Sequence, residues 1–388
     1  MITISTLSEA LRTYYLRTMV DQLDYAVNPF YAQIEKNSEE VDRETIKMVM
    51  RYGRTGNVVF RAEDGALPSS GNRSYLQVDY STKNIYGRFQ LSSKSMKIAQ
   101  KSKESFINIL EEQLESTLQD AKDQLGRSLF GDGNGILAGC SAEGPTTTLT
   151  PDTDPGLKYL AAGMVIDICD NTGTVKVSGR TITAVDDVAG TITISGANVT
   201  TLATDIIVIT GNYGLEMTGL AAVLGTSSNL YGKARASYPF LKPNITAISG
   251  EIDELDIQKG MDDAQKRAGG QTDFIICNEG VKRAYQYLMN ALRMNIDIMD
   301  LKGGYKAMSY NGVPLTHDKY CDAGVMYLLN KGDWKMHQIG DWNWLQEDGA
   351  VLKHVSGYAE YEAVLEYYGD LGCKVPSRQT KLTGITEH

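Results

Sequence analysis

Histidine and cysteine are scarce in this chain of 388 residues, which contains four histidines and five cysteines. No histidine belongs to an H-E-x-x-H motif. The cysteines are odd in number and include no C-x-x-C pair, which is typical of isolated reduced thiols. The sequence therefore predicts no cofactor, no metal site and no catalytic residues, since catalysis would need groups assembled from distant segments.

Positive charge is also in short supply, because 38 lysines and arginines face 48 aspartates and glutamates and the formal net charge is −10. Proteins that bind nucleic acid through its phosphates have the opposite balance. No apolar run approaches the ~20 residues that cross a bilayer. Glu9, Arg12 and Arg17 interrupt the segment where a signal peptide would need an apolar core. General nucleic-acid binding, a membrane partner and secretion are therefore not expected.

The first hundred residues contain a helical part and an extended part. Residues 1–54 look helical, with a capping-box spacing in T-L-S-E at 6–9 and a second helical stretch around 41–50. The apolar face of the first helix consists of Leu7, Leu11, Tyr14 and Tyr15. From 55 to 92, β-like pieces at 57–61 and 75–80 flank a polar tip marked by glycine and proline, which predicts a long hairpin.

The clearest helix covers residues 107–129, where apolar side chains recur every three or four positions. It ends at G-D-G-N-G, residues 131–135, because three glycines in five positions disfavour a helix. A nucleotide-binding loop is a weaker interpretation, since the glycines follow a helix and lack the G-x-G-x-x-G spacing. A calcium loop is also weaker, because Ile136 and Leu137 occupy places that need a ligand and a glycine.

Residues 148–216 are rich in Thr, Val, Ile, Gly and Asp and predict a small antiparallel sandwich or barrel. Its expected strands are 165–169, 175–178, 181–185, 191–195 and 206–210. An α+β region follows, with helices at 254–267 and 279–292, a buried strand at 273–277, and strand-like stretches at 350–355 and 358–367. The β-rich region therefore looks inserted into a larger α+β fold.

Three other features have a functional and a structural interpretation. The aspartates at 152, 154, 186 and 187 have oxygens that suit Ca²⁺, but solvated turn residues are the favoured interpretation. Trp334, Trp342 and Trp344 suggest a stacking platform for a sugar or a base, yet basic neighbours are sparse and packing is favoured. The 22 tyrosines against seven phenylalanines favour contacts between proteins.

The order of these segments resembles the major capsid protein family of tailed bacteriophages, the Hong Kong-97-type fold shared with encapsulins. The matching motifs are L-F-G-D-G-N-G-I-L-A-G at 129–139, N-G-V-P-L at 311–315 and D-A-G-V-M-Y-L-L at 322–329. The resemblance covers most of the chain. It implies an α+β phage capsid fold with an N-terminal arm, an extended loop, a long spine helix, peripheral and axial domains, and an inserted all-β domain.

The implied division of the chain is as follows. Residues 1–54 are the N-terminal arm, 55–92 the extended loop, and 93–130 the spine helix with the first part of the peripheral domain. Residues 131–147 begin the axial domain, 148–216 are the β-rich insertion, and 217–339 complete the axial domain. Residues 340–370 are the return hairpin of the peripheral domain and 371–388 a C-terminal segment.

The resemblance implies a structural major capsid protein, not an enzyme, that self-assembles into the hexamers and pentamers of an icosahedral head. The head encloses double-stranded DNA without sequence-specific binding, and is assembled in the host cytoplasm and found as the virion capsid. Implied partners are further copies of the chain, a separate scaffolding protein, a portal protein and a decoration protein. Two alternatives stay open: an encapsulin-type compartment shell, and an enzyme or carbohydrate-binding module with a β insertion.

The contacts between subunits are expected on the loop and on the arm. The loop candidates are Arg61, Glu63, Asp64, Leu67, Pro68, Arg73 and Tyr75. The arm candidates are Leu7, Leu11, Tyr14 and Tyr15, with a helix packed on its own domain as the alternative. No lysine lies between Arg61 and Arg73, so the lysine–asparagine cross-link of some family members is not expected at the tip, although Lys83 and Lys94 are nearby.

Overall fold

The computed structural model describes residues 28–53, 57–68, 71–72, 74–94, 103–152, 156–291, 298–302, 305–346 and 350–388. These residues form a mixed α+β structure in which strands outnumber helices. Short 3-10 helices occur at Tyr31–Gln33, Pro239–Leu241, Lys331–Asp333 and Pro376–Arg378. The predicted α+β class is confirmed.

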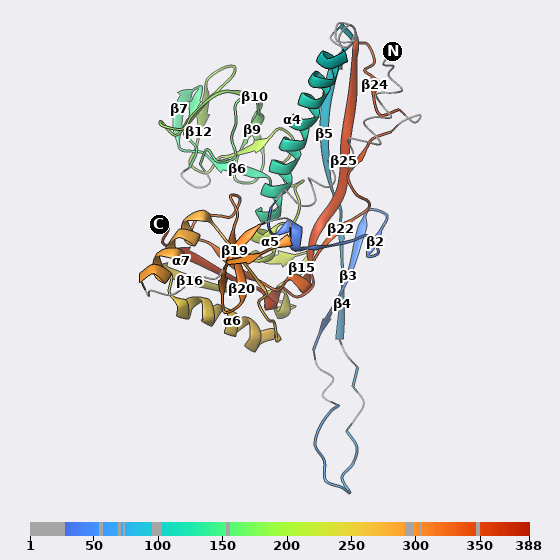
Figure 1. Cartoon of the computed structure of the whole chain (residues 1–388), viewed down its shortest axis with the longest axis vertical. Coiled ribbons are helices and arrows are strands. Elements are labelled where there is room, and N and C mark those ends of the chain that lie inside the picture. Colours follow the sequence, from blue (N-terminus) through green and yellow to red (C-terminus); the bar gives the residue numbers. More distant parts are fainter. Residues whose placement is uncertain are drawn as a thin grey trace.

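A long strand and a long helix form the axis of the molecule. Strand β25 (Glu360–Cys373) pairs with β5 (Lys83–Ser92) along the whole length of β5. Helix α4 (Lys103–Phe130) packs beside β5, and the three run side by side in Figure 1. The other strands of this sheet are β1 (Glu35–Asn37), β22 (Trp334–Gln338), β23 (Asn343–Trp344) and β24 (Lys353–His354).

The helix forms where the apolar stripe predicts it, because the stripe packs into the main core. Leu114, Leu118, Ala121, Leu125 and Leu129 are all buried. The helix ends in the predicted turn, where Gly133 and Gly135 have φ of 88° and 79°. Side chains other than glycine rarely adopt this left-handed conformation, so the turn requires these glycines. The helix-ending interpretation of the G-D-G-N-G segment is confirmed.

A seven-stranded sheet lies beside the lower end of α4 in Figure 1. Its strands, in spatial order, are β16 (Asn244–Gly250), β26 (Thr380–Ile385), β21 (Met326–Leu329), β17 (Phe274–Cys277), β20 (Val313–His317), β19 (Lys306–Tyr310) and β18 (Ile298–Asp300). Helices α6 (Glu254–Ala268) and α7 (Glu279–Ala291) confirm the predicted helices. The short elements α5 (Leu220–Val223), β14 (Asn229–Leu230) and β15 (Lys233–Ala234) lead into this sheet.

Strand β17 is apolar at every position because both faces of the sheet are covered. Phe274 and Ile276 join the main core, which also contains the apolar face of α4. Ile275 and Cys277 join a second core with residues of α6 and α7. The buried strand predicted at 273–277 is thus confirmed.

The β-rich region has a core of its own and consists of antiparallel strands. Its main sheet runs in the order β6 (Ile136–Gly139), β13 (Ile206–Ile209), β9 (Val165–Cys169), β10 (Val175–Asp186), β11 (Thr191–Ile194) and β8 (Thr148–Leu149). A ribbon of β7 (Glu143–Thr146) and β12 (Val199–Thr201) completes it. The expected strands are present, with 175–178 and 181–185 joined in β10. Strands β6 and β7 pair with β13 and β12, so the antiparallel sheets of this region also include residues before 148.

The helix expected around 41–50 is wrong. This segment forms β2 (Val41–Asp42) and most of β3 (Thr45–Tyr52), and β3 pairs with β4 (Ser74–Ser81). Ile46, Met48 and Met50 are buried at every second position, and this period of two needs a strand. The hairpin therefore starts at Thr45. The expected strand at 57–61 is also wrong, because these residues are not in a strand.

The other end of the predicted hairpin and the chain's late strands also differ from expectation. Strand β5 does not belong to the hairpin, since it pairs with β25. The stretch expected at 350–355 contributes only the short β24, whereas the stretch at 358–367 becomes the first part of the long β25. Short alternating segments leave such partners undetermined until the whole sheet is assembled.

Candidate assembly surfaces

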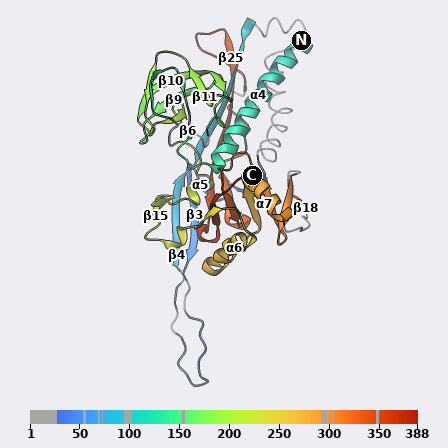
Figure 2. The same cartoon turned by 90° about the vertical axis from the view of Figure 1, so that its left-hand side faces the viewer.

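The described residues between β3 and β4, 57–68 and 71–72, lie on a narrow excursion from the body, which we call the projecting loop. The ladder of β3 and β4 runs without interruption from Thr45 opposite Ser81 to Tyr52 opposite Ser74. The projecting loop extends away from every other element, as Figures 1 and 2 show from two sides. Gly65 donates a backbone hydrogen bond to Ala62 (3.0 Å), which closes a turn at the tip.

The root of the projecting loop is firmly packed. Met48 on β3 and Val78 on β4 are fully buried against the main core. Where β3 ends, Tyr52 stacks on Phe240 with ring centroids 5.1 Å apart and meets Tyr238 edge-on at 6.1 Å. Offset and edge-to-face aromatic pairs stabilise such junctions beyond the area they bury. The projecting loop is therefore fixed to the body at its base and not at its tip.

The structure gathers most of the predicted loop residues on this excursion. Arg61, Glu63 and Asp64 are exposed at the tip, and Leu67 keeps 90% of its surface exposed. Pro68 is half-buried, and Tyr75 lies near the root, on β4, opposite Arg51. Two groups of predicted residues fall outside the described residues, namely Arg73 of the loop and Leu7, Leu11, Tyr14 and Tyr15 of the arm.

The sequence-based reasoning missed the apolar side chains of the tip. Val58 and Phe60 are completely or almost completely exposed, at 93% and 106%, and Val59 is 46% exposed. Folded proteins rarely leave several large apolar groups together on a protruding segment unless another surface covers them. The signal was the run V-V-F at 58–60, which reads as strand and gave no hint of its exposure.

A cavity of about 250 Å³ lies between the start of β5, the end of α4 and the segment that leaves the β-rich region. We call it the β5 cavity. Its apolar lining includes Ile85, Tyr86, Leu215 and Met217. Tyr86 and Leu215 are 57% and 59% exposed. Lys83 also lines it and donates a hydrogen bond to the carbonyl of Gly214 (3.1 Å).

A buried ion pair beside this cavity attaches the β-rich region to α4. Arg127 near the end of α4 pairs with Glu216, and each side chain is only 7% exposed. Asn212 donates a second hydrogen bond to the same carboxylate (2.6 Å). Inside the β-rich region, the hydroxyl of Tyr159 donates a hydrogen bond to the carbonyl of Tyr320 (3.1 Å). The β-rich region is thus attached to the body at two places.

A polar cluster is buried at the end of the β3–β4 hairpin that lies opposite the projecting loop. His337 of β22 is fully buried, with Nδ1 3.7 Å from a carboxylate oxygen of Glu40 and its ring edge-on to Tyr80 of β4. Burial lowers the pKa of His337 to about 4, although the nearby Glu40 acts to raise it, and the weaker effects of Lys374 and Lys335 also lower it. The histidine is therefore neutral at physiological pH.

Asp370 of β25 is a second buried ionisable group and lies opposite His337 in the sheet. It accepts hydrogen bonds from the backbone and hydroxyl of Thr218, at 2.7 and 3.0 Å, and from the backbone of Leu371 at 2.8 Å. Burial nevertheless raises the pKa of Asp370 to about 6. The carboxyl ties the segment leaving the β-rich region to β25.

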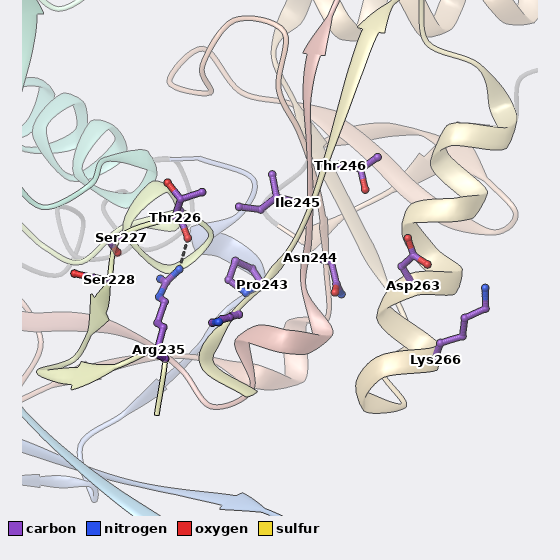
Figure 3. A pocket seen from close by; sticks show the side chains of 13 residues that line it. Thr226, Ser227, Ser228, Arg235, Pro243, Asn244, Ile245, Thr246, Asp263 and Lys266 are labelled. Carbon is purple, nitrogen blue, oxygen red and sulfur yellow. Dashed lines mark hydrogen bonds between the residues drawn. The ribbon is translucent and has the colours of Figure 1, made fainter. Parts of the chain in front are cut away.

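A cavity of about 790 Å³ lies between the segments around β14, β15 and β16 and helix α6. Figure 3 shows Arg235 on one side, and Asp263 and Lys266 on α6 on the other. The guanidinium of Arg235 donates to the carbonyls of Ala222 and Val223, both at 2.8 Å, and of Gly225. Through these bonds the guanidinium holds together the chain segments on its side of the cavity.

The remaining candidate residues have structural surroundings. Trp334, Trp342 and Trp344 are buried in the main core, which confirms the packing interpretation. The five cysteines are buried free thiols. Within the described ranges, no three His, Cys, Asp or Glu residues are grouped as a metal site would need. No helix there has the length and apolar character to cross a membrane.

No protein-family model and no curated protein matches this sequence. Solved structures do match it in fold. The capsid asymmetric unit of cyanophage A-1(L) is 12% identical, with 92% of this chain and 93% of that chain covered and a TM-score of 0.55. The holo-SrpI encapsulin complex from Synechococcus elongatus PCC 7942 is 9% identical, with 93% and 89% covered and a TM-score of 0.50. The expected resemblance is therefore confirmed at the level of fold, and this chain has the tailed-phage capsid fold.

Proposed function

We propose that this protein is the major capsid protein of a tailed phage, a structural subunit that self-assembles into the hexamers and pentamers of an icosahedral head around double-stranded DNA. The observation that carries the proposal is the projecting loop on a chain with the capsid fold. Its root is packed, whereas its tip presents Val58, Phe60 and Leu67 to solvent. A second copy of the chain is the surface that would cover them.

In this proposal each group of elements corresponds to one part of the capsid subunit. The projecting loop is the extended loop, α4 is the spine helix, and the sheet around β25 belongs to the peripheral domain. The seven-stranded sheet is the axial domain, and the β-rich region is the insertion. The predicted arm, with Leu7, Leu11, Tyr14 and Tyr15, would reach under an adjacent subunit. Deleting residues 1–30 should then abolish normal assembly, and normal particles would refute the arm.

The magnitudes favour apolar contacts as the main source of stability at the loop. Burying a Val, Leu or Phe side chain contributes about 1.5–3 kcal/mol. An exposed ion pair made by Arg61, Glu63 or Asp64 contributes ~0–1 kcal/mol. The charged residues would therefore fix register, while the apolar ones hold copies together. Pro68 and Tyr75 would extend the same contact towards the root.

The partners in this proposal are other copies of the chain, a scaffolding protein, a portal protein and a decoration protein bound to the β-rich region. DNA is enclosed without sequence-specific contacts, in keeping with the net charge of −10. Assembly takes place in the host cytoplasm, and the product is the virion capsid. The role is structural, not enzymatic.

A compartment shell of the encapsulin type is the second candidate, favoured by the similarity to the SrpI encapsulin at a TM-score of 0.50. The genes beside the coding sequence separate the two. Terminase and portal genes indicate a phage head, whereas a cargo-enzyme gene without them indicates a compartment.

Expression of the chain with its neighbouring genes, followed by electron microscopy, tests the shared part of the proposal. Closed particles are expected from the wild type, and a stable monomer under every assembly condition would refute it. Val58→Ser with Phe60→Ser should abolish assembly. Val188→Ser is the matched control, because Val188 is 101% exposed but lies on the β-rich region. Particles from the double variant as abundant as from the control would exclude the loop from assembly.

A further inference from the structure

The tip of the projecting loop and the β5 cavity complement each other in size and polarity. Phe60 is an exposed aromatic side chain on the loop. The β5 cavity, of about 250 Å³, is too small for a peptide segment or a typical ligand, since ligand pockets measure about 300–1,000 Å³. It is suited to one large side chain.

The chemistry of the cavity favours an apolar occupant. Leu215 and Tyr86 line it and are more than half exposed. The one carboxylate in its lining, Glu216, is already paired with Arg127 and Asn212. Desolvating an unpaired carboxylate is the main cost of filling a polar site. An apolar side chain that enters this cavity avoids that cost, because Glu216 is already paired.

The charges around the two features are complementary. Glu63 and Asp64 follow Phe60 at the tip and are exposed. Lys83 lines the cavity with its ammonium on the neutral carbonyl of Gly214, and its positive charge also lowers the pKa of the buried Asp370. Phe60 in the cavity would place the two carboxylates within a few residues of this cation.

The tip cannot reach the cavity of its own chain. Strand β4 (Ser74–Ser81) separates the loop from Lys83 and, at about 3.4 Å per residue, spans ~27 Å. The loop then continues in the direction away from α4 and β5, as both views show. The occupant must therefore belong to another molecule of the chain.

We infer that Phe60 of one copy inserts into the β5 cavity of a second copy, with Glu63 and Asp64 directed at the second copy's Lys83. The inference rests on the proposed shell function and names the receptor for the loop. The ion pair of Arg127 and Glu216 then has a role in this contact. It fixes the segment that leaves the β-rich region, and Leu215 and Met217 of that segment form part of the cavity wall.

A cysteine pair tests this contact directly. The chain with Phe60→Cys and Leu215→Cys, assembled into particles, is treated with a short bismaleimide and run on a denaturing gel. The native cysteines are buried and should not react. We expect a ladder of dimers and larger multimers, because each copy carries both halves of the contact. The matched control, Phe60→Cys with Val188→Cys, should stay monomeric on the gel. Particles without the ladder, or an equal ladder in the control, would overturn the inference and leave the shell function standing.

Protection of a single thiol provides a second readout if the double variant fails to assemble. Leu215→Cys should react quickly with a maleimide in the unassembled chain and about tenfold or more slowly in particles, which corresponds to occupancy of about 90% or more. The same thiol in particles that also carry Phe60→Ala should lose this protection. Equal rates in particles with and without Phe60 would refute the insertion. Failure of the wild type itself to form particles would instead refute the proposed function.

Discussion

Replacing His337 with glutamine is expected to remove part of the protein's sensitivity to acid. The folded chain takes up a proton at His337 with a pKa of about 4, against an ordinary 6.5, because the imidazole is buried beside Lys374 and Lys335. Below pH 6.5 the unfolded state therefore binds more protons than the folded state. The free energy of unfolding must then fall as the pH drops from 6.5 towards 4.

The size of the effect follows from the two pKa values. At about 1.4 kcal/mol per pH unit, the full shift corresponds to about 3 kcal/mol, of which about 2.5 kcal/mol is lost between pH 7.5 and 4.5. Asp370 and Asp318 act in the opposite direction, since burial raises the pKa of each to about 6 and their folded forms become more favourable as the pH falls below 6. Both remain in the variant, so their contribution cancels in the comparison.

Urea unfolding of the unassembled chain at pH 7.5 and 4.5 measures this difference. His337→Gln should lose about 2.5 kcal/mol less than the wild type over this interval. His354→Gln is the matched control, because it removes one histidine from an exposed position and should follow the wild type. Parallel pH profiles for His337→Gln and the wild type would show that the buried imidazole does not control acid stability.

Two further changes test the packing around α4. Arg127→Met leaves Glu216 buried without its cation and should cost about 3–5 kcal/mol in urea unfolding, whereas adding Glu216→Gln should restore most of it. An equal loss in both variants would contradict the ion-pair account. Gly126→Ala would make a methyl group overlap the ring of Tyr320 and should cost about 1–3 kcal/mol despite alanine's helix preference, whereas Gly144→Ala meets nothing within 4 Å and should be neutral. Equal stability of the two alanine variants would argue against this close packing.

Sequence patterns correctly predicted the elements that have a long and regular apolar periodicity. The stripe from 107 to 129 specifies one helix because seven apolar positions agree on one face. The eight residues of β3 give a weaker signal, since Met48 and Met50 suit a helix as well as a strand. Only pairing with β4 selects the strand, and that partner lies beyond the projecting loop. The domain boundaries drawn from the resemblance stay predictions.

The functional surfaces were less predictable, because they depend on residues far apart in the chain. Arg127 and Glu216 are 89 positions apart, and His337 and Glu40 lie on strands or turns from opposite ends of the sequence. No local pattern marks such pairs. The exposed charges of the loop could be predicted from its polar tip, whereas the exposure of Phe60 could not, since an apolar run ordinarily indicates burial.

Electron cryomicroscopy of particles assembled from the full chain would show whether copies of the chain form a shell through the projecting loop. We expect closed shells in which the projecting loop of each copy lies on a neighbour, with density for Phe60 in the neighbour's β5 cavity. A chain that stays monomeric in all assembly conditions, or shells in which the loops extend freely into solvent, would contradict it.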